Sequence, residues 1–276
     1  MPETTQAETS EQQETHDLRH LMSRLRSYFL FDPLIWLYTI VLGTLSLLSS
    51  FFDKTGRIQH GVAQLWARTI LKTIGASPQI EGLEKIDTTK AAVYVVNHLS
   101  ALDIPVLYAH LPFQFRILAK RELFHYPFMG WHLRRSGQIP VVLENPRASV
   151  RSLNRAVASL HDGMSLVIFP EGGRSPDGQL HAFMGGAFYA AIKAQVDVVP
   201  VALVGTFEML KMNTWHIKPG PLQLLVGQPI STLGMSTRDM EKLSEQAQAV
   251  IAGLYYSHSM VPDLRGQDHM KDVSKQ

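Results

Sequence analysis

His98 and Asp103 are the residues whose types and spacing best suit proton-transfer chemistry. They occur in the stretch 97–103, N-H-L-S-A-L-D, directly after the apolar run 91–96, which predicts a buried strand. On one continuous helix a five-residue separation would place the two side chains about 140° apart. They can therefore meet only if His98 lies in the turn after the strand and Asp103 in the first turn of the next helix. A carboxylate there holds the imidazole in the tautomer whose free nitrogen accepts a proton.

Ser100 fits this geometry as the N-cap of that helix, with Asp103 three residues later. A second interpretation is that Ser100 and Asp103 only cap a helix and that His98 is a polar loop residue. Taken alone, this stretch leaves both interpretations open.

The stretch 169–175, F-P-E-G-G-R-S, is a second candidate site and follows the apolar run 164–169. Its two glycines allow the backbone to come close to a ligand. Arg174 beside them offers a planar guanidinium, which suits phosphate. This stretch therefore indicates a phosphate-binding loop.

Together the two stretches resemble the signatures N-H-x-x-x-x-D and F-P-E-G-T-R-S of the glycerolipid acyltransferase family. Members such as the bacterial 1-acylglycerol-3-phosphate acyltransferases acylate lysophosphatidic acid. The resemblance covers roughly residues 76 to 230. It implies that His98 is the catalytic base and that Asp103 orients it.

The resemblance also implies how the acceptor is held. Arg174 would bind the phosphate, Gly172 and Gly173 would give close backbone access, and Glu171 would position the loop or the glycerol hydroxyl. Lys120, at the end of a predicted strand, would be a second phosphate contact. The alternative is an Arg174–Glu171 ion pair that only braces a glycine loop.

Ser100 and Ser175 are alternative candidates for a covalent nucleophile. The chain lacks G-x-S-x-G, however, and the family transfers the acyl group directly. We therefore assign Ser100 to capping.

The sequence departs from the family pattern at two places. Gly173 stands where the family has threonine, and Val142-Leu143 stands where it usually has an acidic residue followed by arginine. The missing arginine puts the identity of the acceptor in question. A basic stripe downstream could compensate, or could be a merely solvated helix face: Arg147, Arg151 and Arg155. The block 199–203, V-P-V-A-L, matches the family's weakest signature and is expected to shape the acyl pocket.

Composition limits the other classes of function. The 276-residue chain is long enough for one sizeable core and an appendage, and its net charge of +2 argues against a nucleic-acid binder. Because cysteine is absent, disulfides, zinc–cysteine sites and a cysteine nucleophile are excluded, which fits a reducing compartment. The histidines outside the first stretch show no metal-ligand spacing, so we expect no metal: His125, His132 and His181 among them.

The N-terminal quarter is predicted to associate with a membrane. Residues 1–17 read as a disordered polar tail, and 18–29 as a basic amphipathic helix that Asp32-Pro33 interrupts. Leu34 to Phe52 then carries no charge over 19 residues, just enough to span a bilayer. A helix at 54–75 follows and ends at Gly75. We favour two membrane-associated helices in the range 18–75, on the cytoplasmic face of the inner membrane, over a true single span or a buried core helix.

From residue 76 the chain alternates apolar runs with helical patterns, which predicts an α/β domain at 76–257. Its fold is a mainly parallel sheet covered by helices. The predicted strands are 79–82, 91–96, 115–119, 138–143, 165–169, 198–204 and 222–226. The predicted helices are 102–110, 129–136, 145–160, 185–195 and 236–256. Residues 258–276 read as a disordered tail.

These patterns predict a membrane-associated O-acyltransferase that makes phosphatidic acid from lysophosphatidic acid. Acyl-CoA or acyl carrier protein would supply the acyl group as co-substrate, and we expect no cofactor. One alternative keeps the chemistry on another lysolipid acceptor, for example a lyso-ornithine lipid. A non-catalytic membrane scaffold is a third.

Overall fold

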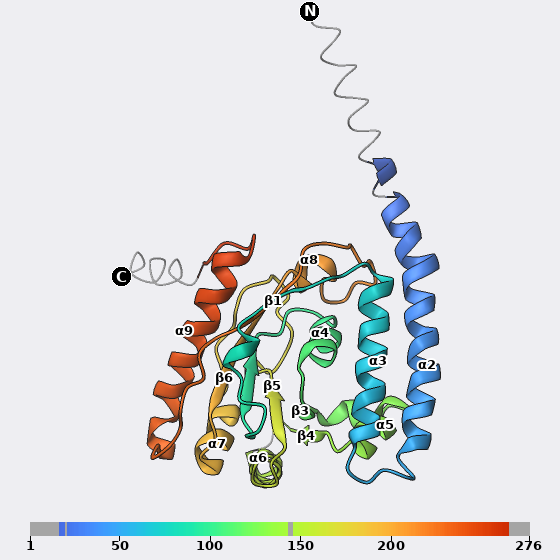
Figure 1. The fold of residues 1–276 in the computed structure, drawn as a ribbon. Coiled ribbons are helices and arrows are strands. Elements are labelled where there is room, and N and C mark those ends of the chain that lie inside the picture. Colours follow the sequence, from blue (N-terminus) through green and yellow to red (C-terminus); the bar gives the residue numbers. More distant parts are fainter. Residues whose placement is uncertain (1–16, 20, 143–145, 265–276) are drawn as a thin grey trace, which may run out of the picture.

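The structure is a computed structural model that describes residues 17–19, 21–142 and 146–264. Of the tails predicted at 1–17 and 258–276, residues 1–16 and 265–276 lie outside the described residues, as does Leu143. These residues form one seven-stranded sheet, the helices around it, and a long N-terminal helix (Figure 1).

The predicted mainly parallel sheet is confirmed. Its strand order is β1-β7-β6-β2-β5-β3-β4, and among the neighbouring strands in the described part of the chain only β6 and β7 are antiparallel. Both ends of every strand lie within two residues of the predicted ends. The strands are β1 Gln79–Glu81, β2 Val93–Val96, β3 Phe115–Lys120, β4 Ile139–Val141, β5 Ser165–Ile168, β6 Val198–Val204 and β7 Gln223–Val226. The central strands β2, β5 and β6 are buried at every residue, because helices cover both faces.

Helices form a layer on each face of the sheet (Figure 1). The domain helices are α3 Arg57–Thr73, α4 Asp103–His110, α5 Met129–Arg135, α6 Pro146–His161, α7 Gly186–Ala194, α8 Thr206–Met209 and α9 Met240–His258. Side chains alternate along β2. Tyr94 and Val96 join a core with α3 and α4, whereas Val93 and Val95 join a core with α6, α7 and α9.

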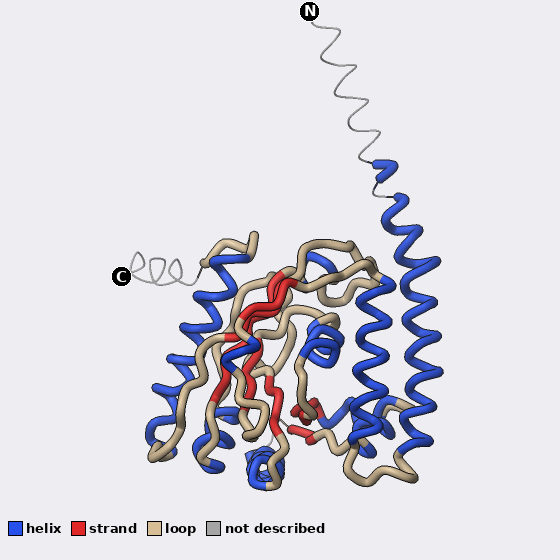
Figure 2. The backbone as a smooth tube through the Cα atoms, in the orientation of Figure 1, coloured by secondary structure: helices blue, strands red, loops and turns tan. Residues whose placement is uncertain are grey.

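The N-terminal helix runs without a break from residue 21 to Ser49, so the interruption predicted at Asp32-Pro33 is wrong (Figure 2). Residues Ser27–Phe31 form a π-helical turn, and α2 Asp32–Ser49 follows directly. The Asp32 N–H bonds to the carbonyl of Ser27, five residues back. The wider turn absorbs Pro33, which sits in the first turn of α2 and has no N–H to donate.

Half of the residues of α2 are exposed and only Ser46 of this helix is buried, so the buried-core interpretation of 34–52 is wrong. Its exposed apolar residues are Trp36, Leu37, Ile40, Val41, Leu45 and Leu48. Its inner side packs on α3, where the Trp66 indole N–H donates to Thr39. Helix α3 is followed by Gly75 at φ +68°, as its predicted end requires.

The C-terminal boundary lies later than predicted. His258 is still in α9, and the chain beyond it contacts the domain through Val261 and Pro262. The Gln179 side-chain amide donates to the Pro262 carbonyl at 2.9 Å. The disorder predicted from 258 is therefore wrong for 258–264.

Candidate active site

His98 and Asp103 meet as the spacing requires. Strand β2 ends at Val96, and His98 lies in the turn that leads to α4, where Asp103 is the first residue. The His98 Nδ1 lies 2.8 Å from Asp103 Oδ2, and the aspartate side chain is fully buried. The imidazole remains about one-fifth exposed, and its Nε2 has no hydrogen-bond partner among the described residues. An ionised Asp103 places the ring proton on Nδ1, which leaves Nε2 free to accept a proton.

Asp103 is held by the backbone of the same turn. Its Oδ2 also accepts from the N–H groups of Leu99, at 2.7 Å, and Ser100, at 2.9 Å. The carboxylate and the start of α4 therefore fix each other, and the imidazole is oriented by a group that cannot itself rotate.

Ser100 is not the N-cap that the sequence predicts, because Leu102 occupies that position. The Ser100 hydroxyl donates to the Leu210 carbonyl at 2.7 Å and accepts from the Leu102 N–H. It ties this turn to the loop after α8. Its proton is engaged, which gives no support to a nucleophilic role.

The second motif comes from β5, which pairs with β2 in parallel, so both motifs leave the same edge of the sheet. The Phe169 ring stacks on the His98 imidazole with centroids 4.0 Å apart. The Ser175 N–H donates to the His98 carbonyl at 2.8 Å, while its hydroxyl bonds to Asp177. Ser175 thus holds the loop, and this contact likewise gives no support to a nucleophile.

Glu171 links both motifs through its carboxyl group. Its Oε1 accepts from the His98 backbone N–H at 2.8 Å, and its Oε2 accepts from the His181 N–H at 2.9 Å. Burial raises the pKa of Glu171, the two backbone hydrogen bonds lower it in part, and the negative charge of Asp103 adds a smaller increase, so that the pKa is about 7. Of the two predicted roles, this geometry supports positioning of the loop.

The other predicted ligand groups of this loop are two partly buried glycines and an exposed arginine. Gly172 adopts φ +71°, and an added Cβ at Gly173 would meet nothing within 4 Å. The Arg174 side chain is exposed and makes no ion pair among the described residues, so the predicted brace between it and Glu171 is wrong. The guanidinium is available to a ligand.

Lys120 is exposed at the end of β3, the strand beside β5. Val142 directly follows β4, whereas the side chain of Arg147 lies outside the described residues. Arg151 and Arg155 are exposed on α6, as a solvated face would be. Neither Arg151 nor Arg155 makes a hydrogen bond or an ion pair with His98.

Sequence reasoning gave no role to Asn97. Its buried amide donates to the Leu203 carbonyl at 2.9 Å and accepts from the Leu203 N–H at 2.7 Å. The bond pair fixes the end of β2 to β6, and so fixes the start of the His98 turn. The only indication in the sequence was that Asn97 is the first residue of the N-H-x-x-x-x-D motif. Only the position of β6 beside β2 gives it a partner.

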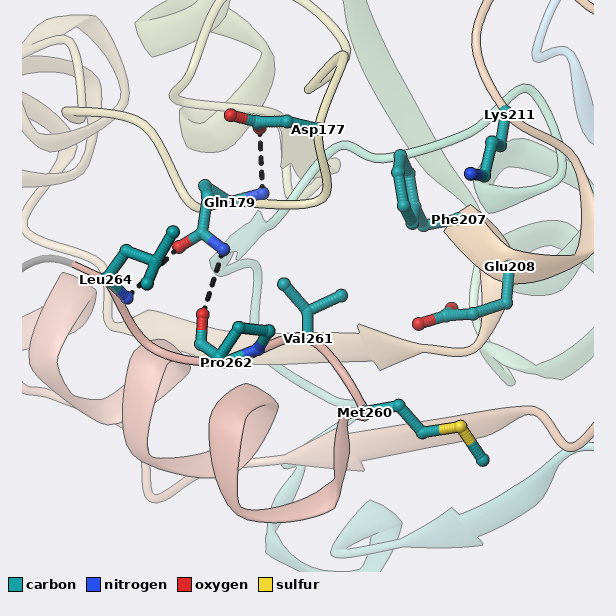
Figure 3. Close-up of a pocket in the computed structure, with 9 residues that line it drawn as sticks. All are labelled: Asp177, Gln179, Phe207, Glu208, Lys211, Met260, Val261, Pro262 and Leu264. Carbon is teal, nitrogen blue, oxygen red and sulfur yellow. Dashed lines mark hydrogen bonds between the residues drawn. The ribbon is translucent and has the colours of Figure 1, made fainter.

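A pocket of about 410 Å³ borders the loop after Arg174 (Figure 3). It lies between the 177–179 loop, the region of α8 and the segment after α9, and none of the predicted site residues lines it. Its lining residues are Asp177, Gln179, Phe207, Glu208, Lys211, Met260, Val261, Pro262 and Leu264. Among the described residues no cluster of three or more His, Asp or Glu could hold a metal ion.

The fold and this pair of motifs define an acyltransferase-type site: a histidine–carboxylate pair and a glycine–arginine loop at one edge of a mostly parallel sheet. Residues 77–204 match the family model described as Acyltransferase. The matched segment contains both motifs, which confirms that they resemble those of the acyltransferases.

Several relatives are similar to the chain. A chloroplastic 1-acyl-sn-glycerol-3-phosphate acyltransferase of Arabidopsis thaliana is 37% identical over 186 residues, which is 65% of this chain and 51% of the relative. The enzyme of the same name from Saccharomyces cerevisiae is 27% identical over 208 residues, 74% of this chain and 67% of the relative. The chain spans about half the length of the first relatives that it matches.

The crystal structure of the 1-acyl-sn-glycerophosphate acyltransferase PlsC from Thermotoga maritima superposes with a TM-score of 0.67 at 26% identity. The match covers 86% of this chain and 97% of that one. The similarity therefore reaches beyond the part that matches the family model.

Proposed function

We propose that this protein is a membrane-associated O-acyltransferase that acylates the sn-2 hydroxyl of lysophosphatidic acid and so forms phosphatidic acid. The acyl donor is a thioester, acyl-CoA or acyl carrier protein. The observation that carries the proposal is the 2.8 Å contact of His98 Nδ1 with the buried Asp103, which leaves Nε2 without a partner beside the glycine–arginine loop. The names of the relatives support the acceptor.

The geometry supports direct transfer with His98 as general base. Nε2 takes the proton of the acceptor hydroxyl as its oxygen attacks the thioester carbonyl. The resulting oxyanion collapses, the carbon–sulfur bond breaks, and the imidazolium returns the proton to the leaving thiolate. Asp103 stabilises the transient positive charge on the ring.

The second motif would hold the acceptor. Arg174 is exposed, carries no ion pair among the described residues, and offers a planar fork for the phosphate. The backbone N–H groups of Gly173 and Arg174 have no partner in the described part of the chain, so they can donate to the phosphate or to the oxyanion. Lys120 would add a second positive charge.

A second acceptor class is favoured by one observation, Val142-Leu143 in place of the family's acidic residue and arginine. Loss of a charge-assisted contact weakens phosphate binding by about 1.5–3 kcal/mol. Another lysolipid, such as a lyso-ornithine lipid, would not need that arginine.

The N-terminal helix supports membrane association. Among the described residues one helix, Asp17–Ser49, is long and apolar enough to cross a membrane. Two serines of this helix, however, both contact the same domain. The Ser27 hydroxyl donates to the Trp215 carbonyl, and the Ser46 hydroxyl lies 3.0 Å from His132 Nδ1.

Those two serines are about 28 Å apart along a helix, which is close to the thickness of the bilayer's hydrocarbon core. A helix that crossed the bilayer would therefore bring the domain into the membrane with it. We infer that the helix lies in one leaflet, with the domain on the cytoplasmic face of the inner membrane.

The test is acyl transfer from a labelled acyl thioester to lysophosphatidic acid in detergent. We expect His98→Ala to lower the rate by about 10²-fold or more, and His125→Ala, an exposed histidine outside the site, to leave it unchanged. Transfer only to other lysolipids would move the assignment to the second acceptor class. No transfer to any lysolipid by wild type, with a cellular phenotype that survives His98→Ala, would favour the scaffold.

A further inference from the structure

Four exposed apolar side chains cluster between η3 Arg121–His125 and the first turns of α5: Tyr126, Phe128, Met129 and Trp131. We call them the α5 knob. Phe128 is 64% exposed and its ring lies 5.2 Å from that of Trp131, so the two aromatic rings form one projecting surface. A cluster of exposed apolar side chains of this kind marks an interaction site.

The backbone holds the α5 knob in a fixed shape. Phe128 has φ +59°, which is unfavourable for a side chain of its size. A Cβ at Gly130 would lie 2.1 Å from the Phe124 carbonyl oxygen, so only glycine permits this close turn. Such local strain is characteristic of segments kept for function rather than for packing.

The helix that carries the α5 knob contacts the C-terminal end of α2. Besides the Ser46–His132 contact, the Arg135 guanidinium donates to the Ser50 hydroxyl at 3.3 Å and lies 4.8 Å from the centre of the Phe51 ring. Phe51 itself is exposed. The apolar surface of the N-terminal helix thus continues onto the catalytic domain.

The charges around the α5 knob indicate what covers it. Lys120, Arg121 and Arg135 are exposed here, against one exposed acid, Glu122. Aromatic side chains bordered by Lys and Arg are typical of the boundary between lipid headgroups and acyl chains. An excess of positive charge favours anionic lipid.

We propose that the α5 knob is a second membrane contact, which inserts into the surface of an anionic bilayer beside the N-terminal helix. This second contact adds to the proposed anchoring by the N-terminal helix, because one helix alone leaves the domain free to rotate about the helix axis. A second contact off that axis fixes how the edge of the sheet with His98 faces the lipid. Only the membrane association within the proposed function is required for it.

The absence of cysteine allows a direct depth measurement. Tyr126→Cys in the full chain is labelled with a polarity-sensitive fluorophore and mixed with vesicles of phosphatidylglycerol and phosphatidylcholine that carry a lipid-borne quencher. Leu233→Cys is the control, because Leu233 is exposed and lies in the segment before α9, a helix on the opposite side of the domain from α2 (Figure 1). We expect a blue shift and quenching at 126 and neither at 233. A labelled 126 that stays unquenched while the protein sediments with the vesicles overturns the proposal.

Affinity provides the second measurement. Phe128→Asn/Trp131→Gln removes the two rings, with Asn chosen because it tolerates positive φ. We expect about tenfold weaker vesicle binding or more, with an unchanged melting temperature and unchanged transfer to detergent-dispersed acceptor. The matched control Leu233→Asn/Met260→Gln removes two apolar side chains elsewhere that are even more exposed.

Equal vesicle affinity of the two double variants overturns the proposal. If wild type transfers acyl groups in detergent but binds no vesicles, the membrane association fails as a whole and this contact fails with it, while the enzymatic assignment stands.

Discussion

Glu171→Gln tests whether the buried carboxyl group organises the His98 turn. The substitution keeps the size of the side chain but replaces one acceptor oxygen by an NH₂ group. That group would face either the His98 N–H or the His181 N–H, both of which now donate to Glu171. One hydrogen bond is lost and two donors are left opposed, which costs about 1–3 kcal/mol.

The pH dependence of stability gives this substitution a distinctive signature. Burial raises the pKa of Glu171 from its ordinary value of 4.5 to about 7. Between these values the folded protein binds more protons than the unfolded chain, so the free energy of unfolding falls as pH rises and levels off above about 7. At about 1.4 kcal/mol for each pKa unit, the whole decline is about 3 kcal/mol.

Denaturant unfolding of wild type and Glu171→Gln near pH 5 and near pH 8 measures this decline. We expect the stability of the variant relative to wild type to rise by up to about 3 kcal/mol between the two conditions. Burial lowers the pKa of His60 to about 4, so stability from that group rises with pH, but it acts equally in both proteins. Parallel pH profiles in the two proteins would refute the reasoning.

Two further substitutions separate ligand binding from support of the fold. Arg174→Ala should raise the KM for the acceptor by about tenfold or more through loss of a charge-assisted contact. Arg155 is also exposed, and Arg155→Ala should leave the steady-state kinetics unchanged. Equal acceptor KM values for the two variants would contradict a phosphate-binding role of Arg174. Asn97→Ala leaves the buried N–H and carbonyl of Leu203 unpaired, so the free energy of unfolding should fall by about 2 kcal/mol or more. A change below about 0.5 kcal/mol in denaturant titrations would show that water or backbone shifts replace the amide.

The strands were predictable because buried parallel strands are continuous apolar runs, as in β2, β5 and β6. The break at Asp32-Pro33 was a wrong prediction for a local reason. Proline removes one backbone donor, and the π-helical turn at Ser27–Phe31 shifts the hydrogen bonds so that no donor is needed there. A preference for a wider turn leaves no periodic signal in the sequence.

Within the site, the meeting of His98 and Asp103 followed from spacing and strand position alone. The hydrogen bonds that join this turn to the rest of the domain did not, because their partners follow other strands of the sheet. Ser100 finds Leu210 only because β6 is the neighbour of β2, and Glu171 finds the His98 N–H only because β5 is the other neighbour. Sheet order is decided by packing across the whole domain, which no single motif encodes.

The peptide backbone of His98 is bonded on both sides by the second motif. Its N–H donates to Glu171, and its carbonyl accepts from Ser175, while the imidazole stacks on Phe169. The two motifs are therefore one cross-linked unit, in which Arg174 is the exposed member. Loss of Glu171 should consequently act through the placement of the imidazole and lower kcat, whereas loss of Arg174 should act through the acceptor and raise KM.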